Sequence, residues 1–491
     1  MDSMTFNGER KSWLILLEGR EKSPFAPQNN NLLRVPEKPG AYIESTDTGV
    51  LYITQPIGFM VEDDADALAK QDELSSWLIT DEPVPLEFDN EPGRTYYVKI
   101  DGDIPDFNRV ANLRRGTITF VCPDPYGYGE EQGPYLFEND AITIENKGTA
   151  EAYPIIETTA LQKSTSFMVA KGEEDFFMIG QPYDVDLETI EQFPQVAFYP
   201  MDSTNGWSPI TEGFFFDDEV SGGTVTNGTI TAENGRFGVS SYGTSQPGWH
   251  GPAVRRSLPK DMEDFSMTFG VGAFNNGNGI GKVMALLLDD NDDIVASIGL
   301  LNTRLGSKNI RVLVRMNDGD NIRRHRVMDY PGDEGNESTV FSGSPLNIQL
   351  RREGDHFYAR TWQVRDGVPH ARHSEDIIDD TVEFQRPVRQ VALFFAKYED
   401  NPVFNMYTYG FRVKDNNTRI MDEDQIPYIV EKDDKIVINT KEEVVMINDE
   451  PVTDLKAFGA NYFMLDKGGN HLFTFPEGYF DSTIKWIERF K

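Results

Sequence analysis

The feature that most constrains the fold of this 491-residue chain is the recurrence of short runs in which apolar and polar residues alternate. A period of two places the apolar side chains on one face of a strand, whereas a helix needs a period near 3.6. Glycine and proline, with 42 and 28 copies, separate the runs and supply turns. The sequence therefore predicts a mainly β protein, long enough for roughly three domains.

The charge balance restricts the expected partners. The chain has 46 Lys and Arg against 81 Asp and Glu, a formal net charge of −35. Such a surface repels nucleic acid and anionic membranes, so we expect no specific nucleic acid and no membrane as a partner. A neutral polysaccharide is compatible with this charge, and so is an acidic channel through which DNA slides.

The single cysteine, Cys122, excludes an intramolecular disulfide and fits assembly in a reducing cytoplasm. Its neighbours Val121 and Pro123 favour a buried hydrophobic role over that of a nucleophile. The first residues lack the basic and apolar segments of a signal peptide, and no apolar run reaches about 18 residues. We therefore expect a chain that is neither exported by a signal peptide nor membrane-spanning.

The first part of the chain contains one convincing helix, at residues 63–79. Ala67, Leu68, Leu74 and Trp77 recur near helical spacing, which predicts a helix that covers one face of a sheet. The preceding residues 18–39 are polar and rich in Pro and Asn, which predicts a long loop. Strands are expected on both sides of this helix, at residues 41–43, 50–55, 86–89, 96–100 and 118–122.

Four motifs follow one another in residues 74–128: Trp77-Leu78 at the helix end, an acidic turn with Pro83 and Pro85, Phe88-Asp89 before Tyr96-Tyr97, and Cys122-Pro-Asp-Pro-Tyr126. Their order resembles the N-terminal domain of the distal tail proteins, which form the baseplate hub of siphophages. The resemblance implies an α+β ring-forming belt domain at residues 1–126 and a structural homo-hexamer without enzyme activity or cofactor. The implied partners are the tail tube protein and a tail-associated hub or lysin protein, and the implied location is the virion tail tip after assembly in the host cytoplasm.

In this family a galectin-like β-sandwich follows the first domain, beginning with a turn of the type Asn-x-Gly-Thr-Ala that residues 146–150 match. Its later pieces occur only after residue 415. The sequence thus predicts a sandwich split into residues 127–192 plus 416–491. The expected strands are 141–146, 152–156, 166–169, 175–180, 435–440, 443–448, 468–475 and 482–490.

Residues 193–415 are then an insertion in a surface loop, with strands of their own. Their rhythm and length predict a two-sheet jelly roll. It resembles the concanavalin-like and laminin-G-like sandwiches that bind sugars, which implies a carbohydrate-binding module for host adsorption. The expected strands are 195–199, 265–271, 282–288, 294–298, 310–314, 346–350, 356–360, 390–395 and 404–411.

A saccharide site needs an exposed aromatic ring beside amides and carboxylates, because the sugar ring stacks while its hydroxyls need polar partners. The loop-borne Tyr242, Trp249 and His250 are the best candidates, and Trp207 is the next. Core packing is the competing interpretation for each of these aromatic residues. Trp362 lies in a predicted strand and is assigned to the core.

Metal sites and catalytic sites are not predicted. Asp289–Asp293 begins like a calcium loop but lacks the Gly and Glu of an EF-hand, so a hairpin turn is favoured. His370 and His373 have no matching second pair of ligands for zinc. The 81 acidic residues give no identifiable glycosidase pair. Two alternatives stay open for the insert, namely a cell-wall polysaccharide hydrolase and a purely architectural module.

Overall fold

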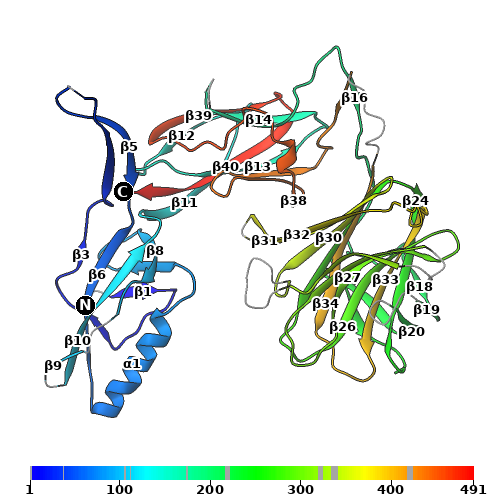
Figure 1. The fold of residues 1–491 in the computed structure, drawn as a ribbon, viewed down its shortest axis with the longest axis horizontal. Helices are drawn as coiled ribbons and strands as arrows, with labels where there is room; N and C mark the ends of the chain where they lie inside the picture. Colours follow the sequence, from blue (N-terminus) through cyan, green and yellow to red (C-terminus); the bar gives the residue numbers. More distant parts are fainter. Residues whose placement is uncertain are drawn as a thin grey trace.

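The computed structural model describes residues 3–36, 38–103, 107–110, 112–172, 175–215, 222–318, 324–332, 341–365, 367–416 and 424–491. The protein is mainly β, as predicted, and α1 (Asp64–Leu78) is the only α-helix among these residues. Figure 1 shows three parts: an N-terminal part that carries α1, a middle sandwich that contains the C-terminus, and a larger sandwich connected to it by two chain segments.

The N-terminal part is built on a long antiparallel pair, β6 (Leu51–Met60) and β10 (Leu113–Cys122). Their apolar side chains alternate inward, and Cys122 lies in the same core as Phe120. Burial raises the pKa of the Cys122 thiol to about 12, as expected of a core residue. The remaining strands are β1 (Met4–Phe6), β2 (Leu14–Leu16), β3 (Glu21–Lys22), β7 (Val84–Phe88), β8 (Thr95–Ile100) and β9 (Asn108–Val110).

Helix α1 packs on this core through Leu74, Trp77 and Leu78. Asp63 caps its first turn by accepting a hydrogen bond from the backbone N–H of Asp66 at 2.8 Å. Leu68, predicted for the buried face, is instead 60% exposed. It lies one position after the buried Ala67, and a rotation of about 100° per residue carries it off the apolar stripe.

The prediction of a long loop at residues 18–39 is wrong. β4 (Gln28–Leu33) pairs with β5 (Tyr42–Thr48) in a hairpin that we call the arm, residues 28–48. Asparagine side chains hold its two strands together: Asn31 Nδ2 donates to Ser45 Oγ at 2.8 Å, and Thr46 Oγ1 donates to Asn30 Oδ1 at 2.7 Å. The arm projects away from the rest of the molecule (Figure 1).

A continuous run of strands joins the N-terminal part to the middle sandwich. β11 (Gly127–Leu136) meets β8 at Tyr128 and pairs along most of its length with β40 (Phe480–Phe490). The guanidinium carbon of Arg94 lies 3.3 Å from the ring centroid of Phe490, and that of Arg489 lies 3.9 Å from the ring centroid of Tyr126. The C-terminal strand thus packs against both parts.

The middle sandwich is galectin-like and is assembled from two distant segments. In its first sheet β40 lies between β11 and β13 (Pro154–Ala160), followed by β36 (Lys435–Asn439), β37 (Val444–Ile447) and β38 (Glu450–Pro451). The second sheet has the order β12 (Ala141–Asn146), β39 (Gly468–Phe475), β14 (Ser166–Ala170) and β15 (Phe176–Gly180). Phe167, Phe480 and Ile484 are among the side chains buried between them.

The insert leaves and re-enters the middle sandwich through two linker strands, β16 (Glu188–Ile190) and β35 (Gln425–Pro427), which pair in parallel. It is a jelly-roll-like sandwich of two sheets. The near sheet, which faces the rest of the protein, contains β17 (Gln195–Tyr199), β21 (Thr229–Glu233), β22 (Arg236–Ser241), β25 (Phe265–Phe274), β30 (Pro345–Glu353), β31 (His356–Arg365), β32 (Val368–Ile378) and β34 (Asn405–Asp415).

The far sheet closes the insert core from the other side. Val283 and Leu393 of the far sheet pack with Phe269 and Phe411 of the near sheet, all of them fully buried. Its strands are β18 (Ser208–Ile210), β19 (Gly213–Phe215), β20 (Gly223–Val225), β23 (Trp249–Gly251), β24 (Ala253–Met262), β26 (Gly281–Leu288), β27 (Ile294–Asn302), β28 (Arg311–Asn317), β29 (Arg324–Tyr330) and β33 (Val388–Tyr398).

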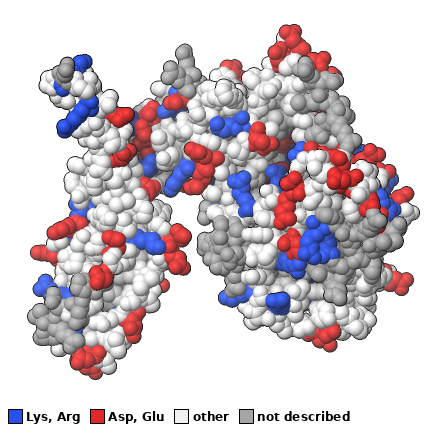
Figure 2. Space-filling model, in the orientation of Figure 1, with Lys and Arg blue, Asp and Glu red and all other residues white. Residues whose placement is uncertain are grey.

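Acidic side chains occur on all three parts of the protein. On the face drawn in Figure 2 they alternate with Lys and Arg, and a group of acids lies at the end of the molecule near β16. The net charge of −35 is therefore distributed over the molecule rather than confined to one part.

Candidate functional site

Three of the four side chains that the sequence singled out are buried in the structure. Trp207, Trp249 and His250 are 6%, 8% and 0% exposed. Trp249 and His250 belong to β23 of the far sheet, where Trp249 packs edge-on against Tyr398, so they are strand residues rather than loop residues. These three side chains present no open ring face, and their part in binding stays a prediction.

Tyr242 is half-buried and lines an open hollow of about 510 Å³ at the edge of the near sheet. We call this the edge hollow. The guanidinium carbon of Arg236 lies 4.3 Å from the ring centroid of Tyr407, which forms another wall. Glu233 and Asn405 supply a carboxylate and an amide. The edge hollow therefore combines aromatic rings, an amide and charged groups of both signs.

Two glycines of β25 allow tyrosine rings from β34 to lie flat on the outer face of the near sheet. A Cβ atom on Gly272 would lie 2.1 Å from Cζ of Tyr407, and one on Gly270 would lie 2.7 Å from the ring of Tyr409. The hydroxyl of Tyr409 also donates a hydrogen bond to Asn347 Oδ1 at 2.9 Å. The backbone thus fixes both rings before any ligand arrives.

Next to Tyr409 is a second hollow of about 210 Å³, which we call the covered hollow. Phe198, Trp362 and Arg412 of the near sheet line it, and Asp449 and Glu450 of the middle sandwich lie over it. Trp362, assigned to the core by its sequence, is 3% exposed, but its indole N–H points outward and donates to the backbone oxygen of Asp449 at 2.7 Å. Trp362 is therefore a contact between two parts of the protein.

Glu450 lies on β38 of the middle sandwich, and its side chain contacts the near sheet. Its carboxylate forms an ion pair with Arg360, lies 3.5 Å from Lys414 Nζ, and accepts a hydrogen bond from Gln349 Nε2 at 3.3 Å. Burial would raise the pKa of Glu450, but Lys414 and Arg360 outweigh it and lower the pKa to about 2. We call Gln349, Arg360 and Lys414 the socket.

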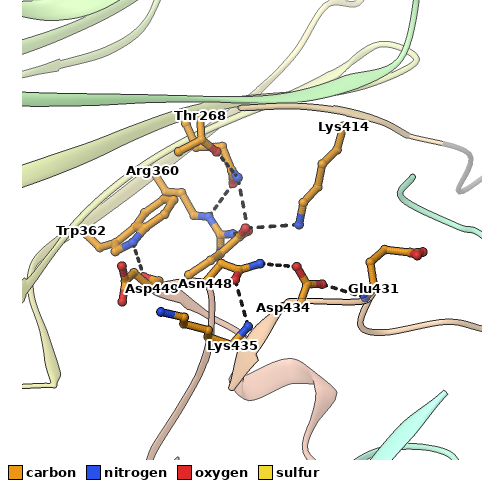
Figure 3. Close-up of polar contacts among 11 residues, drawn as sticks. Thr268, Arg360, Trp362, Lys414, Glu431, Asp434, Lys435, Asn448 and Asp449 are labelled. Atoms are coloured by element: carbon orange, nitrogen blue, oxygen red, sulfur yellow. Dashed lines mark hydrogen bonds and ion pairs between the residues drawn. The ribbon is translucent and has the colours of Figure 1, made fainter. Parts of the chain in front are cut away.

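The turn that carries Glu450 is itself well anchored. Asn448 and Asp449 both have positive φ, at 50° and 65°, a conformation that Asn and Asp tolerate better than most residues. Asn448 Nδ2 donates to Asp434 Oδ1 at 2.6 Å, and Asn448 Oδ1 accepts from the backbone N–H of Lys435 at 3.0 Å (Figure 3). The Asn448-Asp449 pair between two strands is a turn signal that the sequence alone could have revealed. The sequence did not indicate which residues the turn would contact.

The contact between the turn and the socket should resist moderate acid. A carboxyl group whose pKa is lowered on folding stabilises the structure above its ordinary pKa, and this stabilisation is lost as the pH falls toward the folded value. For Glu450 that window extends from about 4.5 down to about 2. We expect protection of residues 444–451 from amide exchange, corrected for intrinsic rates, to be equal at about pH 7 and pH 5; a loss of protection already at pH 5 would contradict the assignment.

The acidic run at residues 289–293 forms a hairpin turn, as predicted. Asp289 accepts hydrogen bonds from the backbone N–H groups of Asn291 and Asp293 at 2.8 and 3.0 Å, between β26 and β27. His373 stacks on Tyr330, and its Nε2 lies 2.8 Å from Glu375. In the described part of the chain, no three His, Cys, Asp or Glu side chains are placed to hold a metal ion, and no helix is long and apolar enough to cross a bilayer.

Comparison with known proteins gives two family matches. Residues 10–122 match the phage tail protein RIFT-related domain, and residues 398–490 match the C-terminal domain of the siphovirus-type tail component. The second match begins inside β33, within the insert. No curated protein sequence matches the chain.

Three solved structures share parts of the fold. SPP1 Dit, described as a hub of the adsorption apparatus of phages that infect Gram-positive bacteria, is 17% identical over 38% of this chain and 76% of its own, with a TM-score of 0.33. The CBM2 module of the evolved Dit of Lactobacillus casei BL23 phage J-1 is 15% identical over 46% of this chain and 98% of its own, with a TM-score of 0.39. The GH16 endo-β-1,3(4)-glucanase SCLam is 11% identical over 52% and 96%, with a TM-score of 0.31.

Proposed function

We infer that this chain, which belongs to the distal tail proteins of siphophages, forms a hexameric hub at the tail tip and carries a saccharide-binding insert. The family matches fall on both sides of most of the insert, which supports a hub built from the first two parts. We propose three domains: residues 1–126, residues 127–192 plus 416–491, and residues 193–415. The proposed hub partners are the tail tube protein on one side and a tail-associated hub or lysin protein on the other, with assembly in the host cytoplasm.

The arm supports the proposal of a ring of subunits. Leu32, Leu33, Tyr42 and Ile43 are between 51% and 65% exposed on its paired strands. Contiguous apolar side chains on an exposed hairpin usually mark a surface that another chain covers. A neighbouring copy in a closed ring would cover the same surface on every subunit.

Replacing both Leu32 and Ile43 by aspartate should prevent ring formation. The two residues are partners across the arm and their side chains share one of its faces, so the change puts two negative charges on that face. We expect wild-type particles of six times the 55.6 kDa chain mass by mass photometry, with rings in negative-stain images, and monomers for the double variant.

Leu305→Asp is a matched control, because Leu305 is an equally exposed leucine, at 51%, on the insert. It should leave the rings intact. Rings that persist in the double variant would show that the arm is not a ring contact, and a wild-type chain that stays monomeric under all assembly conditions would contradict the hexamer itself.

The edge hollow is the observation that best supports saccharide binding by the insert. A sugar can pack against the exposed part of the Tyr407 ring beside Arg236, while Arg236, Glu233 and Asn405 can pair with its hydroxyl groups. Tyr242 contributes a second aromatic side chain to the same hollow. Six copies on one ring would let a weak site hold a cell wall through avidity.

Co-sedimentation of the purified protein with host cell walls tests this proposal. Binding without release of soluble sugar is the expected result. Release of reducing sugar by the purified chain would instead favour the wall hydrolase, and virion assembly without any wall binding would favour the architectural alternative.

A further inference from the structure

A short turn of the middle sandwich meets the near sheet. Asp449 and Glu450 receive hydrogen bonds or ion pairs from four side chains of three near-sheet strands: Gln349 of β30, Arg360 and Trp362 of β31, and Lys414 of β34. The turn lies on the same outer face that carries Tyr407 and Tyr409. It therefore occupies a surface that continues from the edge hollow.

Two of the three socket side chains, Gln349 and Arg360, are held independently of Glu450. Arg360 Nε donates to Gln349 Oε1 at 2.6 Å, and Gln349 Nε2 also donates to Thr268 Oγ1 at 3.0 Å. These contacts all lie within the near sheet, so they hold the amide and the guanidinium in place without help from the turn. A guanidinium fixed beside an ammonium group is suited to carboxylate and phosphate oxygens.

Glu450 separates two spaces. It lines the covered hollow of about 210 Å³ on one side and a cavity of about 240 Å³ on the other, where Arg351 and Lys414 are found. Withdrawal of its side chain would join these spaces and would leave the socket cations facing them. The socket cations would then attract an anionic group locally, although the net charge of −35 opposes its approach from solution.

We propose that the socket is an anion subsite of the saccharide-binding face, held by the protein's own Glu450 until an acidic saccharide displaces it. The ligand class is a sugar chain that carries carboxylate or phosphate groups. Its sugar rings would lie over Tyr407 and Tyr409, and its acidic group would replace the Glu450 carboxylate between Arg360 and Lys414. This inference rests on the proposed saccharide-binding function and gives it a charge preference.

Displacement of Glu450 also releases the contact between the turn and the insert. Trp362 and the socket cations lose their partners on the middle sandwich, while β16 and β35 still connect the two parts. Ligand binding and docking of the turn therefore exclude each other. The apparent dissociation constant of an acidic ligand should therefore equal its value for the open socket divided by the fraction of molecules in which the socket is open.

Isothermal titration of the full chain tests the anion subsite with three probes. Trigalacturonate carries carboxylates, glucose 1-phosphate carries a phosphate, and maltotriose is neutral. Glu450→Gln removes the competing charge, so at least one acidic probe should bind about tenfold more tightly than to the wild type, with maltotriose unchanged. The probe that gains affinity identifies whether the acidic group is a carboxylate or a phosphate.

Two further variants complete the test. Glu442→Gln changes an exposed carboxyl group on the turn between β36 and β37 and should leave all three affinities unchanged. Arg360→Gln added to Glu450→Gln should remove the gain for acidic probes, while circular dichroism shows that both variants remain folded. An equal affinity of the wild type and Glu450→Gln for both acidic probes overturns the proposal, as does an equal gain for maltotriose.

Failure of the anion subsite can be distinguished from failure of the proposed saccharide-binding function. Wall binding that depends on Tyr407, without any gain for acidic probes in Glu450→Gln, leaves the saccharide-binding function standing and rejects only the anion subsite. A gain for acidic probes without wall binding supports the anion subsite and contradicts host-wall adsorption.

Discussion

Tyr407→Ala should abolish sedimentation of the protein with host cell walls. The ring lies flat on Gly272 and forms a wall of the edge hollow, so its removal takes away the stacking surface without opening the insert core. Loss of one aromatic stacking contact costs about 1 kcal/mol, roughly a fivefold loss in affinity at each site. On a particle that binds through several sites at once, the losses multiply and binding falls below detection.

Three comparisons make this result specific. Tyr407→Phe keeps the ring and should retain binding, whereas Gly272→Val should reduce it because the new Cβ atom would occupy the place of the ring. Tyr398→Ala removes an exposed tyrosine, at 38%, from the far sheet and should have no effect. Equal wall binding by Tyr407→Ala and the wild type would remove the edge hollow as the saccharide site.

Ile484→Ala should produce a large loss of stability in the middle sandwich. Ile484 is fully buried on β40, between β11 and β13, with Trp486 next to it on the same face. Truncation of a fully buried isoleucine lowers the free energy of unfolding by about 2–5 kcal/mol because a cavity remains. We expect faster amide exchange in residues 127–136, 154–160 and 435–439, which belong to both segments of the split sandwich.

Lys485→Ala, a change at the neighbouring residue, is the control. Lys485 points to the other face of β40, where its ammonium group lies 2.8 Å from Glu157, and loss of such a partly exposed ion pair costs less than about 1 kcal/mol. Exchange in β26 and β27 of the insert should be unchanged in both variants. Destabilisation of the insert without any change in residues 154–160 would mean that the C-terminal strand does not complete this sheet.

Sequence periodicity identified most strands and the helix because each depends on local patterns. The alternation of Ile118, Phe120 and Cys122 predicted β10, and helical spacing predicted α1. The arm was missed because Asn29, Asn30 and Asn31 are typical loop residues. In the folded arm, Ser45 and Thr46 hydrogen-bond to the side chains of Asn31 and Asn30 from the opposite strand.

The candidate site was less predictable, since it depends on which strands become neighbours. Trp249 and His250 have the composition of a binding loop, but pairing with residues near 397 places them inside the far sheet. Tyr407 and Tyr409 alternate with the inward-facing Met406, which a period-two pattern could have revealed. Their importance comes from Gly270 and Gly272, which are more than 130 positions away and adjacent only in the folded sheet.

The parallel pairing of β16 with β35 has a consequence for how such tail proteins change. The chain leaves the hub and returns to it at one place, so everything between these two strands forms a cassette with a common entrance and exit. A cassette of another size or specificity could be exchanged at this point without altering the strand order of the hub. With the insert binding the host wall as proposed, host preference and particle architecture would be encoded in separable stretches of one gene.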